Sequence, residues 1–167
     1  MIGNDIIDLA LAKKESNWQR KGFIEKIFTA SEQLLILNAD EPEIMVWYLW
    51  SQKEAAYKIY NRQTQIRAYI PLQLECFDLK IIDNIHYGKV CCNDQIYFTK
   101  TQITLDYIST DAVLNPTDFE RIEFLAATTS IKKSNGIPSY YSFQNNNFKP
   151  ISKSHHGRFE RIVTLMD

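Results

Sequence analysis

Three short segments of the sequence carry the residue types that hold metal ions and phosphate groups. Asp5 follows Gly3 near the start of the chain, Glu54 and Lys58 lie within the segment Trp50 to Lys58, and residues 152–158 combine hydroxyl, imidazole and guanidinium groups. Carboxylate oxygens are ligands for Mg²⁺, and cations and hydroxyls hold phosphoryl oxygens. The chemistry that these segments could support together is that of a metal-assisted phosphate site.

Glu54 and Lys58 are four residues apart, which places a carboxylate and an ammonium group on the same face of a helix. One interpretation is an ordinary ion pair, worth a few tenths of a kcal/mol. However, Trp47 to Trp50 directly precede the pair and predict a helix that is apolar on nearly all sides. Charged residues are rarely buried without a partner or a ligand, which favours a functional site.

Asp5 stands in an apolar segment, beside a glycine that permits close approach of another backbone. An aspartate that hydrogen-bonds its own turn is the simpler interpretation. If Asp5 instead meets Glu54 in space, the two carboxylates would form a site for Mg²⁺, completed by phosphate and water oxygens.

The segment Ser152-Lys153-Ser154-His155-His156-Gly157-Arg158 has donors suited to a phosphate group. A solvated loop near the end of the chain is the alternative. The adjacent histidines do not form a good zinc pair, because neighbouring residues of a strand point to opposite faces.

Composition narrows the class of protein. The chain has 167 residues, of which 45% are hydrophobic and 23% charged, which fits one globular domain over residues 1–167 and excludes disordered and fibrous classes. No apolar run reaches the length of a membrane-spanning helix, the N-terminus is acidic rather than signal-like, and the three cysteines have no metal-ligand spacing. We therefore expect a cytoplasmic protein.

The net charge of −1 argues against attraction of the whole molecule to nucleic acid or to a membrane. Residues 13–26 nevertheless carry a local charge of +3, and the basic residues of this segment are Lys13, Lys14, Arg20, Lys21 and Lys26. They form either a solvated helix face or a docking surface for an acidic partner.

The first part of the chain predicts one strand and three helices. The strand covers Ile2 to Leu9, and the helices cover Asn17 to Phe28, Ala30 to Asn38 and Pro42 to Arg62. Thr29 and Glu32 have the spacing of a capping box, in which each side chain bonds the other residue's backbone amide. The helix from Pro42 is the longest and carries Glu54 and Lys58.

The second part predicts an antiparallel meander. Its strands fall within Tyr69–Ile82, Ile85–Cys92 and Gln95–Tyr107, with a hairpin turn at residues 92–95. A helix over Phe119–Ser130, a polar and mobile loop over Lys132–Lys149 and a final strand over Arg161–Met166 follow. We therefore predict an α+β fold, an antiparallel sheet packed against a long central helix, with no internal repeat.

Four motifs in order resemble the 4′-phosphopantetheinyl transferase superfamily, and specifically its short holo-acyl-carrier-protein synthase branch. They are Gly3-Asn4-Asp5-Ile6, the segment from Phe23 to Glu32 that reads Phe-x-x-x-Ile-Phe-Thr-x-x-Glu, the segment from Trp50 to Lys58 that reads Trp-x-x-Lys-Glu-Ala-x-x-Lys, and Ser152-Lys153-Ser154-His155. The resemblance covers residues 1–62 and 150–167. The longer, two-lobed branch would place the Ser-His motif before Gly-x-Asp, so the order of the motifs selects the short branch with a single lobe.

The resemblance implies transfer of the 4′-phosphopantetheine group from coenzyme A to a serine of an apo carrier protein, with release of adenosine 3′,5′-bisphosphate. Asp5, Glu54 and Lys58 are the implied catalytic residues, and Asp5 and Glu54 would bind Mg²⁺. Lys53, Lys58, Ser154 and His155 would bind the coenzyme. Members often have a further acidic ligand two residues after the first Asp, where this chain has Ile7, with Asp8 following.

The implied partners are coenzyme A and an acyl or peptidyl carrier protein, which would dock on the basic residues of segment 13–26. Short members commonly form trimers, so we expect a homo-oligomer. The alternatives are a non-catalytic relative that binds coenzyme A or a carrier protein as an adaptor, and a purely structural domain in which Glu54 and Lys58 form only an ion pair. The type of carrier is left open, because surface complementarity decides it.

Overall fold

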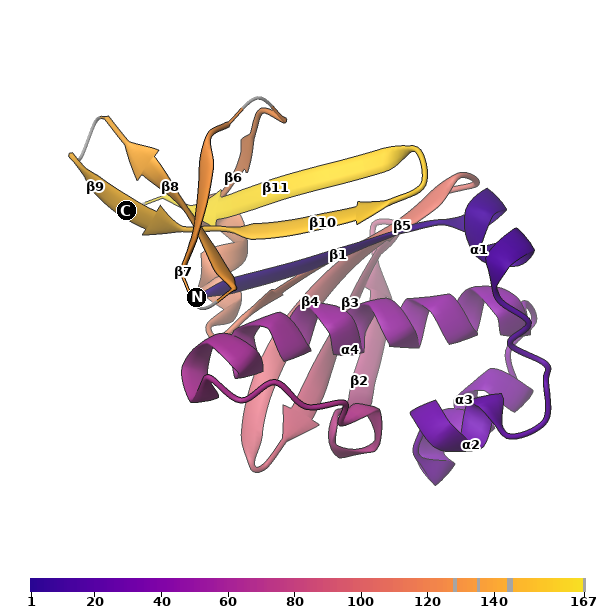
Figure 1. The fold of residues 1–167 in the computed structure, drawn as a ribbon. Helices are drawn as coiled ribbons and strands as arrows, with labels where there is room; N and C mark the ends of the chain where they lie inside the picture. Colours follow the sequence, from indigo (N-terminus) through magenta and orange to yellow (C-terminus); the bar gives the residue numbers. More distant parts are fainter. Residues whose placement is uncertain (128, 135, 144–145, 167) are drawn as a thin grey trace.

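The structure is a computed structural model that describes residues 1–127, 129–134, 136–143 and 146–166. Helices predominate in the first part of the chain, and strands make up the rest (Figure 1). The helical elements are α1 (Leu9–Glu15), α2 (Phe23–Ile27), α3 (Ala30–Leu37), α4 (Pro42–Thr64) and the 3-10 helices η1 (Pro71–Gln73) and η2 (Pro116–Arg121).

The described strands form three antiparallel sheets. The first has five strands in the order β1-β5-β4-β3-β2: β1 (Ile2–Asp8), β5 (Tyr107–Val113), β4 (Gln95–Ile103), β3 (Ile85–Cys92) and β2 (Glu75–Ile82). The second has the order β10-β11-β6: β10 (Ser152–His156), β11 (Phe159–Leu165) and β6 (Ile122–Leu125). The third has the order β7-β8-β9: β7 (Ile131–Ser134), β8 (Ile137–Ser142) and β9 (Asn147–Pro150).

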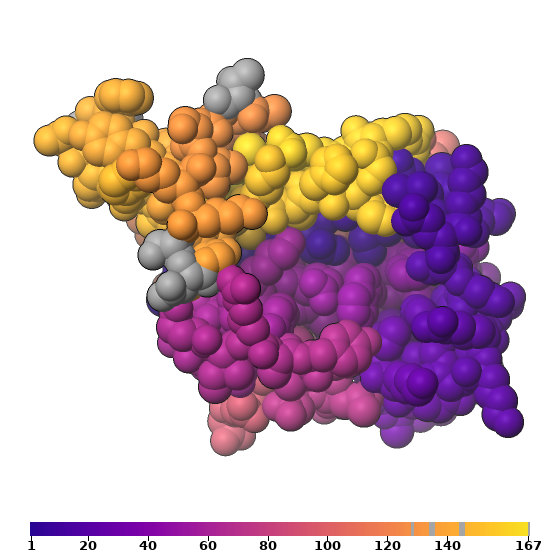
Figure 2. Space-filling model, in the orientation of Figure 1, coloured from indigo at the N-terminus to yellow at the C-terminus, as the bar shows by residue number. Residues whose placement is uncertain are grey.

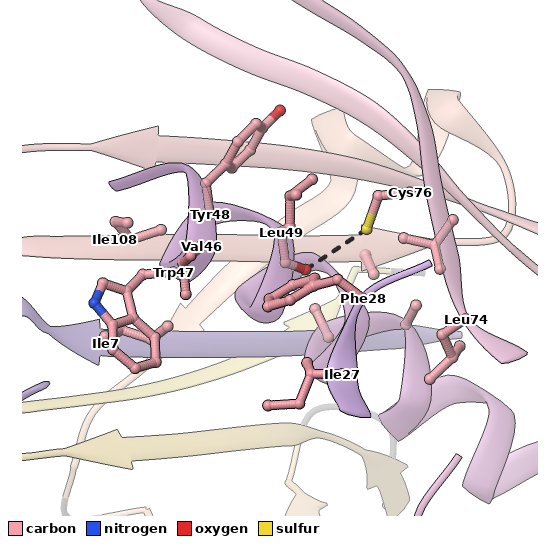
Figure 3. Close-up of a cluster of buried hydrophobic side chains, with 14 of the residues drawn as sticks. Ile7, Ile27, Phe28, Val46, Trp47, Tyr48, Leu49, Leu74, Cys76 and Ile108 are labelled. Atoms are coloured by element: carbon pink, nitrogen blue, oxygen red, sulfur yellow. Dashed lines mark hydrogen bonds between the residues drawn. The ribbon is translucent and has the colours of Figure 1, made fainter. Parts of the chain in front are cut away.

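The main core lies between α4 and the five-stranded sheet. Val46, Leu49 and Ile59 of the helix are fully buried, as are Val90 and Ile108 of the sheet. Phe28 and the residues around it close one end of this core (Figure 3). Trp47, Tyr48 and Leu49 of the apolar run are buried in this core, and the predicted α+β fold is confirmed.

Gly3 lets β1 approach α4 closely. A Cβ atom at this position would overlap the carbonyl oxygen of Ala55 on α4, so only glycine fits there. The close approach brings the middle of β1 against the middle of α4, where Asp5 and Glu54 lie. The last strands of the chain form a layer on the other side of β1 (Figures 1 and 2).

Most of the first part of the chain agrees with the sequence prediction. The capping box is present, since the Thr29 hydroxyl accepts from the Glu32 amide and the Glu32 carboxylate accepts from the Thr29 amide. The predicted helix over Asn17–Phe28 is wrong in its first half: residues 17–22 form turns, and Gly22, with φ of 82°, precedes a helix that begins only at Phe23. Helix α1, which Asp8 caps, was not predicted.

The meander is confirmed, although β2 begins only at Glu75 and the last predicted strand ends at Ile103 as β4. Strand β5, which begins at Tyr107, was not predicted. Asn93 and Asp94 both have positive φ, as the predicted two-residue hairpin turn requires. The helix predicted over Phe119–Ser130 is wrong, because η2 ends at Arg121 and β6 then pairs with β11. The loop predicted over Lys132–Lys149 is also wrong: β7, β8 and the start of β9 pair there, and residues 135, 144 and 145 lie outside the described part.

The final strand predicted over Arg161–Met166 corresponds to β11, which begins two residues earlier. In the described part of the chain, no helix is long and apolar enough to cross a membrane.

Candidate functional site

Asp5 and Glu54 meet between β1 and α4. The Asp5 side chain is only 14% exposed, and Glu54 is partly buried on the helix face that β1 covers. Burial raises the pKa of Asp5, although the positive charge of Lys58 opposes this shift. Burial and the negative charge of Asp5 together raise the pKa of Glu54 to about 7. Two interacting carboxylates therefore share a weakly solvated site.

Lys58 supplies the nearby positive charge. Its Nζ atom lies 3.6 Å from Oδ1 of Asp5 and donates a hydrogen bond of 2.5 Å to the carbonyl oxygen of Asn4. The Lys58 side chain is 29% exposed, so the ammonium group also reaches solvent. The three residues that the sequence picked out as catalytic are thus brought together by one strand and one helix.

The residues at this site fit a divalent cation. Asp5 and Glu54 are close enough for the Asp5 charge to raise the pKa of Glu54, and the Lys58 ammonium group opposes this shift. No group of three or more His, Cys, Asp or Glu side chains able to hold a metal occurs in the part of the chain that the structure describes. Asp5 and Glu54 could therefore hold Mg²⁺ through two protein ligands, a number that leaves positions for water and phosphate oxygens.

A cavity of about 310 Å³ lies beside these residues, and three lysines and an arginine line it. Lys58 and Arg62 line it from α4, Lys153 and His155 from β10, and Lys133 from β7. Lys153 is also paired with Glu160 at 2.6 Å. A hollow with this charge suits an anionic ligand, and it adjoins the two carboxylates because Lys58 belongs to both.

Arg62 was missed at the sequence level, although its spacing from Glu54 and Lys58 could have revealed it. Positions 54, 58 and 62 follow one another at intervals of four and so lie along one stripe of the helix. The Arg62 guanidinium donates to the carbonyl oxygens of Ile2 and Ile151, which joins α4 to the first strand and to the segment before β10.

His155 and Ser154 point in different directions, as neighbours on a strand do. His155 is exposed and lines the cavity. Ser154 is buried, and its hydroxyl oxygen accepts a hydrogen bond of 2.9 Å from the side-chain amide of Asn4. Both were expected to bind the coenzyme, and of these two the structure places only His155 at the cavity.

Lys53 does not reach the cavity, contrary to the expectation that it binds the coenzyme. It is 1% exposed, and its Nζ atom lies 2.6 Å from Glu32 and donates to the carbonyl oxygens of Ile27 and Pro71. These three contacts use all three ammonium protons. The helical spacing explains the difference, because Lys53 precedes Glu54 and so points to another side of α4.

The basic residues of segment 13–26 are exposed, with Lys13 and Lys14 in the last turn of α1 and Lys26 in the last turn of α2. The Arg20 guanidinium lies over the ring of Phe23. The helices that carry these residues lie at the end of the molecule where β1 finishes and α4 begins (Figure 1), whereas the cavity is lined by the later turns of α4. Asp5 and Glu54 lie between the two regions.

Comparison with known families agrees with this geometry. A sequence model described as "4′-phosphopantetheinyl transferase superfamily" matches residues 1–114. The chain belongs to this superfamily. The matched residues of this phosphopantetheinyl transferase include Asp5, Glu54 and Lys58, whereas Lys153 and His155 lie beyond them. No curated protein matches the chain.

Membership indicates phosphopantetheinyl transfer as the general chemistry. The superfamily uses coenzyme A as the co-substrate and implies a carrier protein as the partner. The α+β architecture, with a long helix against antiparallel strands, is consistent with this superfamily.

Proposed function

We propose that this protein is a Mg²⁺-dependent transferase of the holo-acyl-carrier-protein synthase type. It would transfer 4′-phosphopantetheine from coenzyme A to a serine of an apo acyl or peptidyl carrier protein and release adenosine 3′,5′-bisphosphate. The observation that carries the proposal is the meeting of Asp5 and Glu54 beside Lys58, at a cavity with a cationic lining.

Each residue has a distinct part in the proposed reaction. Asp5 and Glu54 hold the metal, which supplies charge neutralisation at the pyrophosphate when it is bound. Lys58 adds a positive charge on the cavity side of the carboxylates and so orients the pyrophosphate. Phosphoryl transfer depends mainly on such positioning and electrostatic stabilisation.

Glu54 is also the proposed proton acceptor. Its carboxylate would accept the proton of the attacking serine hydroxyl, directly or through a water. The cavity then holds the anionic part of the coenzyme, with Arg62 and His155 as its donors. Lys53 is left out of the coenzyme site because its ammonium group is fully engaged with Glu32 and two carbonyl oxygens.

The exposed basic residues of segment 13–26 form the proposed docking surface for the carrier protein, which would approach from the end of the molecule opposite the coenzyme cavity. We also propose a homo-oligomer, and the resemblance to the short branch favours a trimer. Light scattering of the purified protein would measure its oligomeric state.

The decisive experiment is intact-mass spectrometry of a purified apo carrier protein after incubation with coenzyme A, Mg²⁺ and this protein. We expect the carrier mass to rise by about 340 Da, the mass of the transferred group by its formula. The shift should disappear with EDTA and with Glu54→Ala. Several carrier proteins of the fatty-acid, polyketide and peptide-synthetase types should be tried in parallel.

Calorimetry with coenzyme A separates the remaining outcomes. If no carrier gains mass but coenzyme A binds, the protein is a binding relative rather than a transferase. If neither transfer nor binding occurs under conditions in which the protein is folded, the proposed function is wrong.

A further inference from the structure

Strand β10 lies along the outer edge of β1, but no ladder of backbone hydrogen bonds joins the two strands. On one side β1 pairs with β5, while on the other side β10 lies alongside it although the two strands belong to different sheets (Figure 1). The backbone groups on the outer edge of β1 are instead bonded by side chains. The Asn4 amide donates to the Ser152 hydroxyl at 2.9 Å, and the Asp8 amide donates to Nδ1 of His156 at 2.9 Å.

The spacing of these contacts defines how the two strands run. Asn4 is bonded to Ser152 and Asp8 to His156, so four residues of β1 match four residues of β10 and the strands are parallel. A ladder would fix the register of two such strands through the backbone. Here only side chains can fix it, and a loss of these contacts would leave β10 free to shift along β1.

The strongest of these contacts lies at the turn between β10 and β11. Arg158 donates to the Asp8 carboxylate from its backbone amide at 3.0 Å, from Nε at 2.8 Å and from a terminal nitrogen at 2.9 Å. Gly157 has φ of 54°, and a Cβ atom there would meet Asp8 at 2.5 Å, so the turn fits closely over this carboxylate. The Asp8 side chain is 2% exposed and also accepts from the Ala10 and Leu11 amides that begin α1.

Because the Arg158 guanidinium is bonded to Asp8, it does not line the cavity that Lys58 and His155 line. The guanidinium is shared between Asp8 and, at 3.4 Å, Asp106. A cation in the segment that follows the Ser-His motif would suit a phosphate group, but these contacts indicate a structural use instead. The residues that do line the cavity from β10 are Ser152, Lys153 and His155.

We propose that Arg158 is a positioning residue for the transfer reaction. By fixing the end of β10 to the end of β1, the Asp8–Arg158 contact sets the distance between His155 at the cavity and Asp5 at the carboxylate pair, which lie on these two strands. The inference rests on the proposed function, because it assigns the anionic part of the coenzyme to the cavity. Arg158 itself touches neither the coenzyme nor the metal.

The test compares Arg158→Met and Arg158→Lys with the wild-type protein. We expect Arg158→Met to lower kcat/KM for coenzyme A by about 10- to 100-fold, as a small misplacement of a substrate does, while KM for the carrier protein stays unchanged. Arg158→Lys retains the charge but not the bidentate contact and should give an intermediate value. Calorimetry should show the same order of coenzyme affinities.

Arg121→Met is the matched control. Arg121 is half-exposed, as Arg158 is, and it also pairs with an aspartate, Asp118, but it contacts neither β1 nor β10 in any hydrogen bond or ion pair that the structure describes. We expect its kcat/KM for coenzyme A and its coenzyme affinity to equal those of the wild-type protein. Circular dichroism establishes the folded fraction of each variant, and Arg158→Lys serves if Arg158→Met does not fold.

The outcomes distinguish this inference from the proposed function. If the wild-type protein transfers the group and a folded Arg158→Lys variant has unchanged kcat/KM and coenzyme affinity, the positioning role is wrong and the proposed function stands. An equal fall in kcat/KM for the carrier protein and for coenzyme A would also contradict the positioning role. If the wild-type protein neither transfers the group nor binds coenzyme A, the proposed function is wrong and the positioning role falls with it.

Discussion

Glu54 holds its proton to a higher pH in the folded protein than in the unfolded chain. Burial is the main cause, the Asp5 charge adds to it, and Lys58 opposes both. A carboxyl group with a pKa of about 7 can exist in either form at neutral pH, so its protonation should respond to a bound cation. The residue therefore links stability, metal binding and the proposed proton transfer.

The pH dependence of stability follows from this shift. Between pH 4.5 and about 7 the unfolded state has lost the Glu54 proton while the folded state retains it. Since stability rises with pH only where the unfolded state binds more protons, the free energy of unfolding falls as pH rises through this window, by about 2 kcal/mol. Urea denaturation of the metal-free protein at pH 5 and pH 8 measures the fall.

Two comparisons test this assignment. Glu54→Gln should reduce the fall, because its side chain does not titrate, and the raised pKa of Asp5 should account for what remains. Millimolar Mg²⁺ should raise the stability of the wild-type protein at pH 8, since a ligand that binds only the folded state stabilises it. A fall of the same size in Glu54→Gln would show that another group causes it.

Lys58 should matter for transfer more than for folding. Its ammonium group is partly exposed and lies between the carboxylates and the cavity. We expect Lys58→Met to lower kcat/KM by about 100- to 1,000-fold, as the loss of a well-placed electrostatic donor does. The carrier mass assay gives the rate, with the exposed Lys80 replaced by Met as the control.

At the scale of the elements, the buried ion pair between Lys53 and Glu32 joins helices α3 and α4. Glu32 closes the capping box of α3 and accepts from the Cys76 amide at the start of β2, while Lys53 holds the end of α2 and η1. The Thr-x-x-Glu and Lys-Glu motifs, which the sequence separates by about twenty residues, thus meet in one contact. This contact explains the use of Lys53 without reference to the coenzyme.

Replacing Lys53 by Met leaves the Glu32 carboxylate buried without its partner. We expect a loss of about 3–5 kcal/mol in the free energy of unfolding, the usual effect of breaking a buried pair. Coenzyme affinity, measured by calorimetry where the variant is folded, should stay unchanged. A weakened coenzyme affinity with unchanged stability would return Lys53 to the coenzyme site.

The elements that the sequence predicted well are those with local signals. The capping residues Thr29 and Glu32 and the apolar run before Glu54 each specify a helix through neighbours in the sequence. The strands between residues 122 and 150 have no such signal. β6 forms by pairing with β11, about forty residues later. In β8 and β9 every side chain except that of Ser142 is half-buried or exposed, so no apolar alternation marks these strands.

The candidate site follows the same rule as the elements: residues in local motifs were predicted well, and residues with distant partners were not. Asp5, Glu54 and Lys58 stand in motifs whose spacing reports their chemistry, and the structure brings them together. The interactions of Lys53, Ser154 and Arg158 depend on partners distant in the sequence, namely Glu32, Asn4 and Asp8. Residue type alone suggested phosphate binding for such groups because cations and hydroxyls serve both purposes.

At the scale of the whole molecule, charge is distributed unevenly although the net charge is only −1. The cationic cavity and the exposed basic residues of segment 13–26 lie on different sides of the Asp5 and Glu54 pair. Two anionic substrates could then approach without competing for the same surface. That residues 1–167 form one domain stays a prediction.

Charge reversal on α1 tests the docking surface. We expect Lys13→Glu with Lys14→Glu to raise KM for an acidic carrier protein about tenfold at low salt and less at high salt, with coenzyme affinity unchanged. Lys80→Glu is the control, since Lys80 lies on β2 and is 63% exposed. An equal KM at both salt concentrations for the α1 variant and the wild-type protein would contradict this surface.

The side-chain contacts along the outer edge of β1 also bear on how the protein is made. This strand is synthesised before Ser152, His156 and Arg158, which bond its outer edge and lie 148 to 150 residues after their partners in the sequence. Until then the nascent chain has an open strand edge, the feature through which proteins most readily aggregate. Messages truncated before residue 152 should therefore yield chains that depend on chaperones, and the side of the cavity that β10 lines can form only after these residues have been synthesised.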